Sequence, residues 1–384
     1  MTILYEPVCH GAEHAPFNAA MLATARAAFP YREVSFFSEP SHARAVHELL
    51  DRATARAVSW NPIDIAPRAC RRASARFPYE WRIVSEVLAR SRGSEISQIV
   101  ACAVTHAGLA ALQCQLLTRA RYTTVAVVHH SGLASTLGSR STLALLRWTA
   151  GGRLRHIVLG RSIHRAVANR LPAACDMRSM RHPYLFPDVA ASPWPAGGPM
   201  RFGFLGLASA DKGFDRFCRL ANRVSQHAGT AAGRPRFELI GRLDAASRSG
   251  LAALDPAGVV EIGSDHAPMP REDYEQRVRE LTYAVLPYSQ DHALASSGAI
   301  LDAFAHAKPC IALRTPLFEE YFSAMGDIGY LCEDEEEMTG TVSRIAAGGP
   351  EAEARYLAQR RNIIAAREIF NPRRVANELR RLFD

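Results

Sequence analysis

The stretch RFGFLGLASADKGFDRF, residues 201–217, does most to decide the fold. Its first six residues read as a short buried strand, GLASADKG as a turn of small residues, and Phe214 begins an amphipathic helix. A strand that passes through such a turn into a helix is typical of a parallel α/β sheet. The alternation continues through TYAVLPY, a helix expected over 296–307, and PCIAL. We therefore predict a Rossmann-like domain over residues 200–365.

The first half of the chain repeats this alternation. It opens with the strand TILYEPV and reaches VAVVHH and RHIVLG through several helical segments. Short apolar strands between helices indicate a parallel sheet covered on both faces. A proline- and glycine-rich stretch at 186–200 reads as a linker. The predicted fold class is α/β, with domains at 1–190 and 200–365 facing a cleft. A C-terminal helix at 366–384 is expected to pack back on the first domain.

Composition excludes several classes of protein. The chain of 384 residues is 48% hydrophobic and 22% charged, which is typical of a globular protein. No apolar run approaches the ~20 residues of a membrane-spanning helix, and the N-terminus shows no signal-peptide pattern. The eight cysteines are scattered without CxxC spacing, which indicates neither a zinc site nor a disulfide framework. We expect a cytoplasmic protein.

The positive charge is uneven along the chain. Residues 1–199 carry 23 Arg, no Lys and 12 acidic residues, whereas residues 200–384 carry 21 Arg, two Lys and 26 acidic residues. Much of the excess lies at 68–82, where arginines surround aromatic residues. This segment suits an anionic membrane surface, a lipid phosphate or an acidic glycan, although a solvated basic face without a ligand is equally consistent. We expect Arg72, Arg76 and Trp81 to bind the acceptor. No nucleic-acid-binding motif accompanies the charge.

Only two lysines occur, Lys212 and Lys308, against 44 arginines. Lys212 stands in the turn before a helix, where a compact charge suits a diphosphate. Lys308 follows the helix expected over 296–307, where it suits the negative end of the helix dipole and needs no ligand.

The helix expected over 296–307 offers further phosphate donors. Ser296 and Ser297 are expected to cap its first amides, and Gly298 allows an anion to approach them. Asp302, one turn further along, is placed to accept hydrogen bonds from neutral hydroxyl groups. One helix can thus serve both a diphosphate and a sugar.

Residues 200–384 resemble the C-terminal domain of GT-B glycosyltransferases, in particular the large retaining family of bacterial nucleotide-sugar-dependent enzymes. The resemblance rests on the unit from Gly206 to Gly213, on LIGR at 239–242, on 259–278 and on SSGAILDAFAHAKPCIA. It implies a GT-B fold and a nucleotide diphosphate sugar, linked to UDP or GDP, as co-substrate. No other cofactor and no metal is expected, since Lys212 and a helix N-terminus can offset the diphosphate's charge. The donor-binding residues that it implies are Gly206, Lys212, Gly241, Arg242, His266, Tyr288, Ser296, Ser297, Gly298 and Asp302.

The chain departs from the family's motif at three places. Asp302 stands where the family has a second glutamate, which holds the ribose hydroxyls. Leu294 stands where the first glutamate is expected, and Asp291 or His292 lie nearby at a different spacing. The arginine that usually precedes the lysine is absent, because Leu207 and Ala208 occupy its region.

In the N-terminal half, VVHHSG resembles the family's late strand that ends in a histidine near the donor sugar. His129 and His130 are both candidates, and the alternation favours His130. In CHGAEH, an inverting enzyme could use Glu13 or His14 as the general base that deprotonates the acceptor. A retaining enzyme needs no such base, because the donor phosphate can take the proton.

The leading hypothesis is a retaining glycosyltransferase that acts on a lipid-linked or polysaccharide acceptor in cell-surface glycan biosynthesis, peripheral to the inner face of the bacterial plasma membrane. Two alternatives are a GT-B scaffold protein that has lost catalysis and another GT-B nucleotide-sugar enzyme such as an epimerase. A dehydrogenase is disfavoured, because GxGxxG follows neither domain's first strand.

Overall fold

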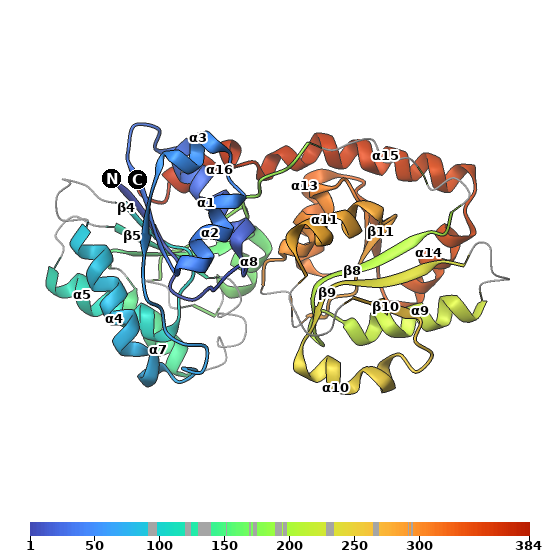
Figure 1. The fold of residues 1–384 in the computed structure, drawn as a ribbon, viewed down its shortest axis with the longest axis horizontal. Helices are drawn as coiled ribbons and strands as arrows, with labels where there is room; N and C mark the ends of the chain where they lie inside the picture. The colour runs from blue at the N-terminus through green and yellow to red at the C-terminus, as the bar shows by residue number, and fades with distance from the viewer. Residues whose placement is uncertain are drawn as a thin grey trace. The chain divides into compact units, whose positions relative to one another are not determined.

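The structure is a computed structural model of the chain (Figure 1), which forms two compact units. The first unit is built mainly from Met1–Leu185 and Ile369–Asp384, and the second mainly from Phe186–Ala293 and Ser297–Glu368. The structure describes residues 1–90, 98–119, 124–129, 140–150, 152–168, 170–171, 175–188, 194, 198–227, 234–263, 269–290, 292 and 295–384.

A parallel sheet of seven strands forms the centre of the first unit, in the order β3-β2-β1-β4-β5-β6-β7. The strands are β1 (Thr2–Tyr5), β2 (Val34–Ser38), β3 (Val58–Pro62), β4 (Gln98–Ala101), β5 (Thr124–His129), β6 (Leu154–Leu159) and β7 (Met177–Met180). The helices are α1 (Ala15–Ala28), α2 (Pro40–Glu48), α3 (Arg52–Arg56), α4 (Ala73–Arg90), α5 (His106–Arg119), α7 (Arg140–Thr149), α8 (Arg161–Ala168) and α16 (Pro372–Arg380).

Both faces of the central part of this sheet are buried, and β1, β2 and β4 are buried at every residue, whereas the edge strands β3 and β7 are partly exposed. Successive residues of β1 enter different cores: Leu4 packs with α1, α2 and α16, whereas Ile3 packs with α4, α5 and α8. The C-terminal helix α16 lies against α1, where the Arg380 guanidinium donates hydrogen bonds of 3.1 and 2.9 Å to the carbonyl oxygen of Ala28 (Figure 1). That carbonyl belongs to the last residue of α1, so the arginine satisfies a helix end that has no internal partner.

The second unit contains a parallel sheet of six strands in the order β10-β9-β8-β11-β12-β13. The strands are β8 (Arg201–Ala208), β9 (Arg236–Leu243), β10 (Val260–Ile262), β11 (Tyr283–Leu286), β12 (Cys310–Leu313) and β13 (Gly329–Cys332). The helices are α9 (Phe214–His227), α10 (Ala245–Leu254), α11 (Arg271–Glu280), α12 (Gly298–Ala305), α13 (Pro316–Met325), α14 (Glu335–Ala347), α15 (Pro350–Ala366) and the 3₁₀ helix η4 (Arg367–Phe370).

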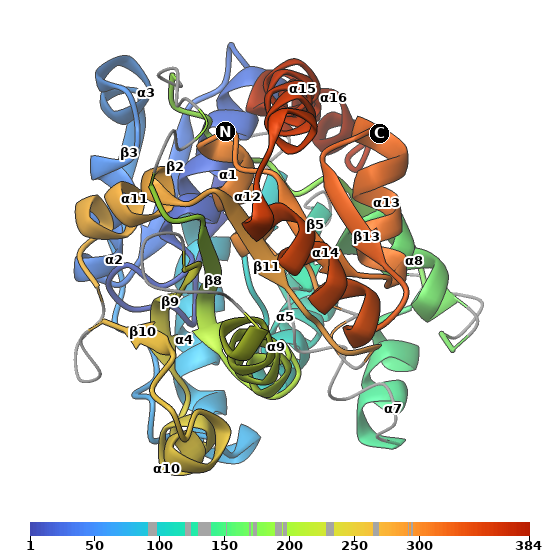
Figure 2. The same ribbon diagram turned by 90° about the vertical axis from the view of Figure 1, so that its right-hand side faces the viewer.

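Helices cover both faces of this sheet as well. Side chains of α9 and α14 pack in one core, and those of α11 and α12 pack in another core on the opposite face; Figure 2 shows α9 and α14 on the near side of β8 and β11. The strand order reverses between β8 and β11, because β9 and β10 lie on one side and β12 and β13 on the other. Ligands of open α/β sheets bind beyond the carboxyl ends of the strands at such a reversal.

The predicted α/β class with two Rossmann-like sheets is confirmed. The helix expected over 296–307 is shorter and spans Gly298–Ala305. It ends there because Ala307 adopts a left-handed conformation, with a φ of 50°. In the part of the chain that the structure describes, no helix has the length and apolar character needed to cross a membrane.

Candidate active site

Lys212 lies in the turn between β8 and α9. Gly206, near the end of β8, has a φ of 86°, a conformation that glycine adopts without strain. The Lys212 Nζ atom lies 3.8 Å from the position that a Cβ atom would take on Gly206, and the Cβ atom of Ala299 lies 3.9 Å from that position. The ammonium group, the bare backbone of Gly206 and the first turn of α12 therefore border the same space.

The surroundings of Lys212 favour an anionic ligand. The side chain is half-buried, and its Nζ atom lies 5.8 Å from the centre of the Tyr288 ring. Burial lowers the pKa of Lys212, while the negative charges of Asp211 and Asp302 oppose this change. An ammonium group that has lost part of its water gains from a bound anion.

Two glycines hold this turn and its strands close together. A Cβ atom on Gly213, whose φ is 73°, would lie 1.9 Å from the carbonyl oxygen of Pro287. A Cβ atom on Gly241 would lie 1.9 Å from the carbonyl oxygen of Gly206, its partner in the β8–β9 register. Gly241, expected in the donor site, thus lets the two strands approach. Arg242 follows it on β9, is exposed, and pairs in register with Leu207.

The N-terminus of α12 is arranged differently from the prediction. Ser297 precedes the helix, but its side chain does not cap the helical amides. Its hydroxyl group instead forms a 3.0 Å hydrogen bond with the hydroxyl group of buried Tyr288. Among the described residues, apart from the chain neighbours of Gly298 and the helix backbone, no atom lies within 4 Å of the position of a Cβ atom on Gly298. Ser296 is half-buried. The amides of the first turn are thus not occupied by the Ser297 side chain that was expected to cap them.

Asp302 lies one turn along α12 and already has partners from α11. Its carboxylate accepts a 2.9 Å hydrogen bond from the Tyr274 hydroxyl and forms an ion pair with Arg271 at 3.4 Å. The sequence did not indicate that α11 would bind this residue.

His292, in the connection between β11 and α12, is a buried residue that sequence reasoning noted but did not assign. Its Nδ1 atom lies 2.9 Å from an Asp211 carboxylate oxygen, and its ring packs edge-on against Tyr288 with centroids 4.7 Å apart. The other Asp211 oxygen accepts a 2.5 Å hydrogen bond from Ser209. The signal in the sequence was the neighbouring pair Asp211–Lys212, which brings a carboxylate as well as a charge to the turn.

A buried polar network shapes the connection that follows β1 in the first unit. His42 lies 2.7 Å from the Gly11 carbonyl oxygen through Nδ1 and 2.8 Å from the Asn18 amide through Nε2. Asn18 also donates to the buried carboxylate of Glu6, whose pKa is raised by burial. This network positions the backbone at Gly11, close to the predicted general bases.

The two predicted bases differ in their surroundings. Glu13 forms a 3.0 Å ion pair with Arg68. His14 is exposed and has a φ of 50° at the residue before α1. Of the two residues, His14 is the more accessible.

Arg76, one of the residues predicted to bind the acceptor, forms an ion pair within the first unit. The Arg76 guanidinium pairs with the buried carboxylate of Glu80 at 3.3 Å, and only 13% of its side chain is exposed. Because a buried carboxylate needs a compensating charge, the Arg76 guanidinium compensates the charge of Glu80 in the first unit. Arg72 is exposed, and Trp81 is 36% exposed.

Lys308 follows α12, and its backbone N–H donates a 2.9 Å hydrogen bond to the carbonyl oxygen of Ala303 in the last turn of that helix. The Arg367 guanidinium donates hydrogen bonds of 3.2 and 2.8 Å to the carbonyl oxygens of Phe304 and Ala305, at the end of that helix. Lys308 is 1% exposed, and burial, together with the charge of Arg360, lowers its pKa to about 7. The end of α12 is therefore bound both by the adjacent lysine backbone and by an arginine distant in sequence.

Two predicted residues, His130 and His266, lie outside the described residues, as does Leu294. The neighbouring His129 is buried, and its Nε2 atom lies 2.9 Å from Nδ1 of His156. His129 therefore packs inside the first unit.

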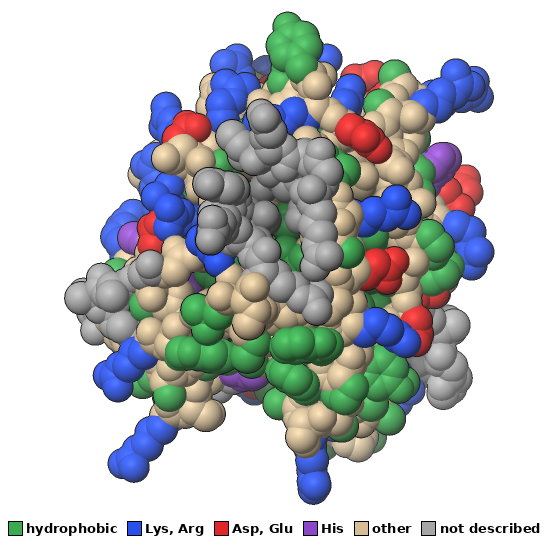
Figure 3. Space-filling model, turned by 90° about the vertical axis from the view of Figure 1, so that its left-hand side faces the viewer, with side chains coloured by type: hydrophobic (Ala, Val, Ile, Leu, Met, Phe, Trp, Pro, Cys, Tyr) green, Lys and Arg blue, Asp and Glu red, His purple; other side chains and the backbone are tan. Residues whose placement is uncertain are grey.

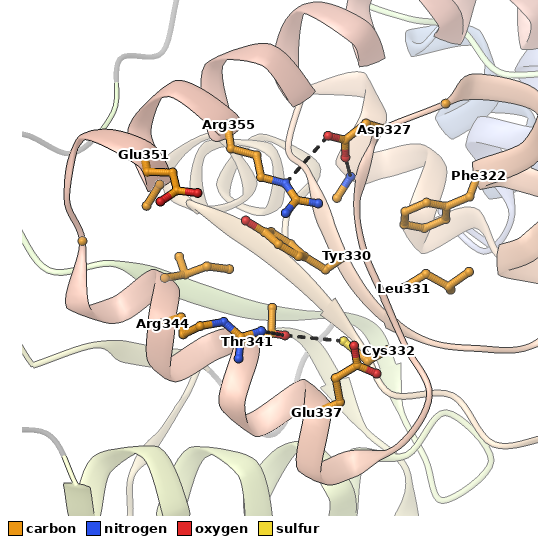
Figure 4. A pocket seen from close by; sticks show the side chains of 15 residues that line it. Phe322, Asp327, Tyr330, Leu331, Cys332, Glu337, Thr341, Arg344, Glu351 and Arg355 are labelled. Carbon is orange, nitrogen blue, oxygen red and sulfur yellow. Dashed lines mark hydrogen bonds and ion pairs between the residues drawn. The ribbon is translucent and has the colours of Figure 1, made fainter.

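A separate hollow of about 660 Å³ lies in the second unit between β13, α13, α14 and α15 (Figure 4). Its two guanidinium groups have partners: Arg355 lies 4.2 Å from the centre of the Tyr330 ring, and Arg344 donates to Thr341 at 2.8 Å. None of the predicted site residues that the structure describes lines this hollow. Among the described residues, no three His, Cys, Asp or Glu side chains gather as metal ligands.

Comparison with known proteins identifies the fold through structure alone. No family model matches the chain, and no curated protein matches it in sequence. Alr3699/HepE of Anabaena, solved in complex with UDP and glucose, matches with a TM-score of 0.67 and 12% identity over 99% of this chain and 98% of that chain. WaaB, a lipopolysaccharide outer core galactosyltransferase solved in its apo form, matches with a TM-score of 0.64 and 12% identity over 100% and 99%.

TarM of S. aureus, solved with Fondaparinux, alpha-GlcNAc-glycerol and UDP, matches with a TM-score of 0.57 and 13% identity. The match covers 79% of this chain and 59% of TarM. The chain therefore has the GT-B fold, as its resemblance to GT-B glycosyltransferases implied.

Proposed function

We propose that the protein is a glycosyltransferase that transfers a sugar from a nucleotide diphosphate sugar to a glycan or lipid-linked acceptor. The observation that carries this proposal is the space bordered by the Lys212 ammonium, Gly206 and the first turn of α12. It combines a cation, a backbone without a side chain and the N-terminus of a helix, three features that suit a diphosphate. Its position at the reversal between β8 and β11 is where open α/β sheets bind nucleotides.

In the proposed reaction, the acceptor oxygen forms a bond to the anomeric carbon while the bond from that carbon to the diphosphate breaks. Negative charge develops on the leaving diphosphate, and Lys212 together with the α12 amides stabilises it. In a retaining reaction the acceptor proton passes to the departing phosphate. In an inverting reaction, His14 is the candidate base, because it is more exposed than Glu13. Retention is the outcome that we propose.

The proposed acceptor side lies in the first unit. Residues 96–175 contain nine arginines and no aspartate or glutamate, and Figure 3 shows one face of this unit on which hydrophobic side chains gather between basic side chains, which in this unit are arginines. Leu117 of α5 is 68% exposed and Trp148 of α7 is 44% exposed. Exposed apolar side chains in a basic region suit an anionic membrane surface. We propose that the enzyme works at the cytoplasmic face of the plasma membrane on a lipid-linked or cell-surface glycan.

The predicted basic segment at 68–82 contributes less free charge than its sequence suggests. Arg68, Arg76 and Arg82 each pair with a carboxylate, at 3.0, 3.3 and 2.6 Å. Arg72 and Trp81 remain the candidates for acceptor contact in that segment.

The test is turnover of nucleotide sugars by the purified protein. We expect release of UDP or GDP from one donor of a panel, increased by a lipid-linked acceptor, and loss of this activity in Lys212→Ala. Undiminished activity in Lys212→Ala would place the diphosphate elsewhere. Donor binding without turnover in any acceptor mixture would favour the scaffold alternative, and interconversion of the donor sugar without transfer would favour an epimerase.

A further inference from the structure

The connection between β11 and α12 contains a second polar group beside Lys212. His292 is 7% exposed, and among the described residues its Nε2 atom has no hydrogen-bond partner. A buried polar atom without a partner costs about 1–3 kcal/mol, so such atoms require an explanation. The imidazole is nevertheless firmly held, by Asp211 on one side and by the Tyr288 ring on the other.

The contacts of Asp211 determine which proton the imidazole carries. An ionised carboxylate only accepts hydrogen bonds, so the Nδ1 atom that lies 2.9 Å from Asp211 must carry a hydrogen. Burial alone would raise the pKa of Asp211, but hydrogen bonds from Ser209 and His292 hold it below its usual value. Asp211 is thus ionised at neutral pH. With Nδ1 protonated, the Nε2 atom of a neutral imidazole presents a lone pair.

The imidazole is kept neutral by its position. Burial lowers the pKa of His292, the hydrogen bond to Asp211 opposes this change, and the charge of Lys212 lowers the pKa further. Tyr288, the other side chain packed against the ring, is uncharged at neutral pH because burial raises its pKa above the usual value. At neutral pH the free Nε2 atom is therefore a hydrogen-bond acceptor.

The hydrogen-bond acceptor of His292 and the ammonium group of Lys212 suit different parts of a nucleotide sugar, the sugar and the diphosphate. A diphosphate at neutral pH has no hydrogen to donate, so its oxygens suit Lys212 and not His292. The hydroxyl groups of a sugar can donate. Lys212 and His292 both lie against the Tyr288 ring, with the Nζ atom 5.8 Å and the imidazole centre 4.7 Å from its centre.

We propose that the Nε2 atom of His292 accepts a hydrogen bond from a hydroxyl group of the donor's sugar, and that Asp211 is the positioning residue that fixes the imidazole for this contact. The inference rests on the proposed function and adds a specificity-determining residue to it. His292 would supply the acceptor near the position where Leu294 replaces the glutamate expected from the resemblance.

Two substitutions of His292 distinguish the role of its Nδ1 atom from the role of its Nε2 atom. In His292→Asn, the amide nitrogen can take the place of Nδ1 and keep the hydrogen bond to Asp211, but the acceptor at Nε2 is lost. In His292→Gln, the longer side chain returns an amide oxygen near the Nε2 position. Both remove the ring, so they share its effect on folding. His306→Asn is the control, because His306 is another buried histidine of the same unit.

The measured quantity is the ratio of the Kd of a nucleotide sugar to the Kd of its own nucleoside diphosphate. The probes are UDP-glucose, UDP-galactose and UDP-N-acetylglucosamine beside UDP, and GDP-mannose beside GDP. A neutral hydrogen bond contributes about 0.5–1.5 kcal/mol, so His292→Asn is expected to raise the ratio about 2- to 13-fold. His292→Gln is expected to stay nearer to the wild type, and His306→Asn to match it.

The outcomes distinguish this inference from the proposed function. An unchanged ratio in His292→Asn, with UDP or GDP still bound, would overturn the role of His292 and leave the proposed function intact. A wild-type protein that binds none of the probes would contradict both. A measurement on the wild-type protein covers the case in which the variants fail to fold. The ¹⁵N resonance of His292 Nε2 is expected to shift when a nucleotide sugar is added and to stay in place with the nucleoside diphosphate; equal shifts would refute the contact.

Discussion

Gly206→Ala tests the proposed diphosphate space directly. The added methyl carbon would lie 3.8 Å from the Lys212 Nζ atom and 3.9 Å from the Ala299 Cβ atom, distances of ordinary van der Waals contact. The protein without ligand can therefore accommodate it. A diphosphate held between the ammonium group and the α12 amides would have to occupy the same volume as the methyl group.

The expected magnitudes follow from the backbone and from packing. Gly206 has a φ of 86°, and a left-handed conformation costs an L-residue about 1–2 kcal/mol. For a unit of this size, that cost lowers Tm by about 2–8 °C. Forcing a ligand past one additional methyl group costs about 1–3 kcal/mol, which is about 5- to 150-fold in Kd.

Gly258→Ala is the matched control for backbone strain. Gly258 also has a positive φ, of 62°, and among the described residues, apart from its chain neighbours, no atom lies within 4 Å of the position of its Cβ atom. This variant is expected to lose stability comparably and to bind nucleotides like the wild type. The assay is calorimetric titration with UDP and GDP, together with thermal unfolding. If Gly206→Ala bound nucleotide as tightly as Gly258→Ala does, the placement of the diphosphate would be refuted.

Three further predictions concern stability and membrane binding. Gly213→Ala is expected to destabilise the second unit by about 3 kcal/mol or more in chemical unfolding, because its Cβ atom would lie 1.9 Å from the Pro287 carbonyl oxygen; normal stability would contradict the close approach. Lys308 has a pKa of about 7 in the folded protein, so the unfolded chain binds more protons between about pH 7 and 10, and stability should rise with pH there by up to about 1.4 kcal/mol per unit. A pH titration of stability in which Lys308→Met retains that rise would count against the buried lysine. Replacing Leu117 and Trp148 by alanine is expected to reduce co-sedimentation with vesicles that contain anionic lipid, relative to phosphatidylcholine vesicles; unchanged binding would exclude these side chains from the membrane contact.

The two parallel α/β sheets could be predicted from the sequence, because the alternation of apolar strands with helices is a local pattern. The segment at 201–217 has the strand, turn and helix that its residues indicate, and Gly213 lies where a positive φ is required. The reversal of strand order between β8 and β11 was not evident in the same way, since pairing of strands distant in sequence depends on the whole sheet.

The site was only partly predictable, because contacts between distant residues decide which groups are free. The sequence predicts that Ser297 caps a helix, but its hydroxyl group forms a hydrogen bond with the hydroxyl group of Tyr288 instead. The sequence places Lys308 at the end of α12, where its backbone N–H binds the Ala303 carbonyl oxygen, but it does not indicate that Arg367 reaches the same helix end from 62 residues further along the chain. Arg76 looks like a surface cation, but its neighbour one helical turn away is a buried glutamate.

The central claim is that Lys212, and not the chain's other lysine, binds the diphosphate of a nucleotide. The most direct measurement is the affinity of UDP and GDP for the wild-type protein, Lys212→Met and Lys308→Met. A hydrogen bond to a charged group contributes about 1.5–3 kcal/mol, so Lys212→Met should bind the preferred nucleotide about 10- to 150-fold more weakly, while Lys308→Met should bind it like the wild type. Equal affinities in Lys212→Met and the wild type would contradict the claim.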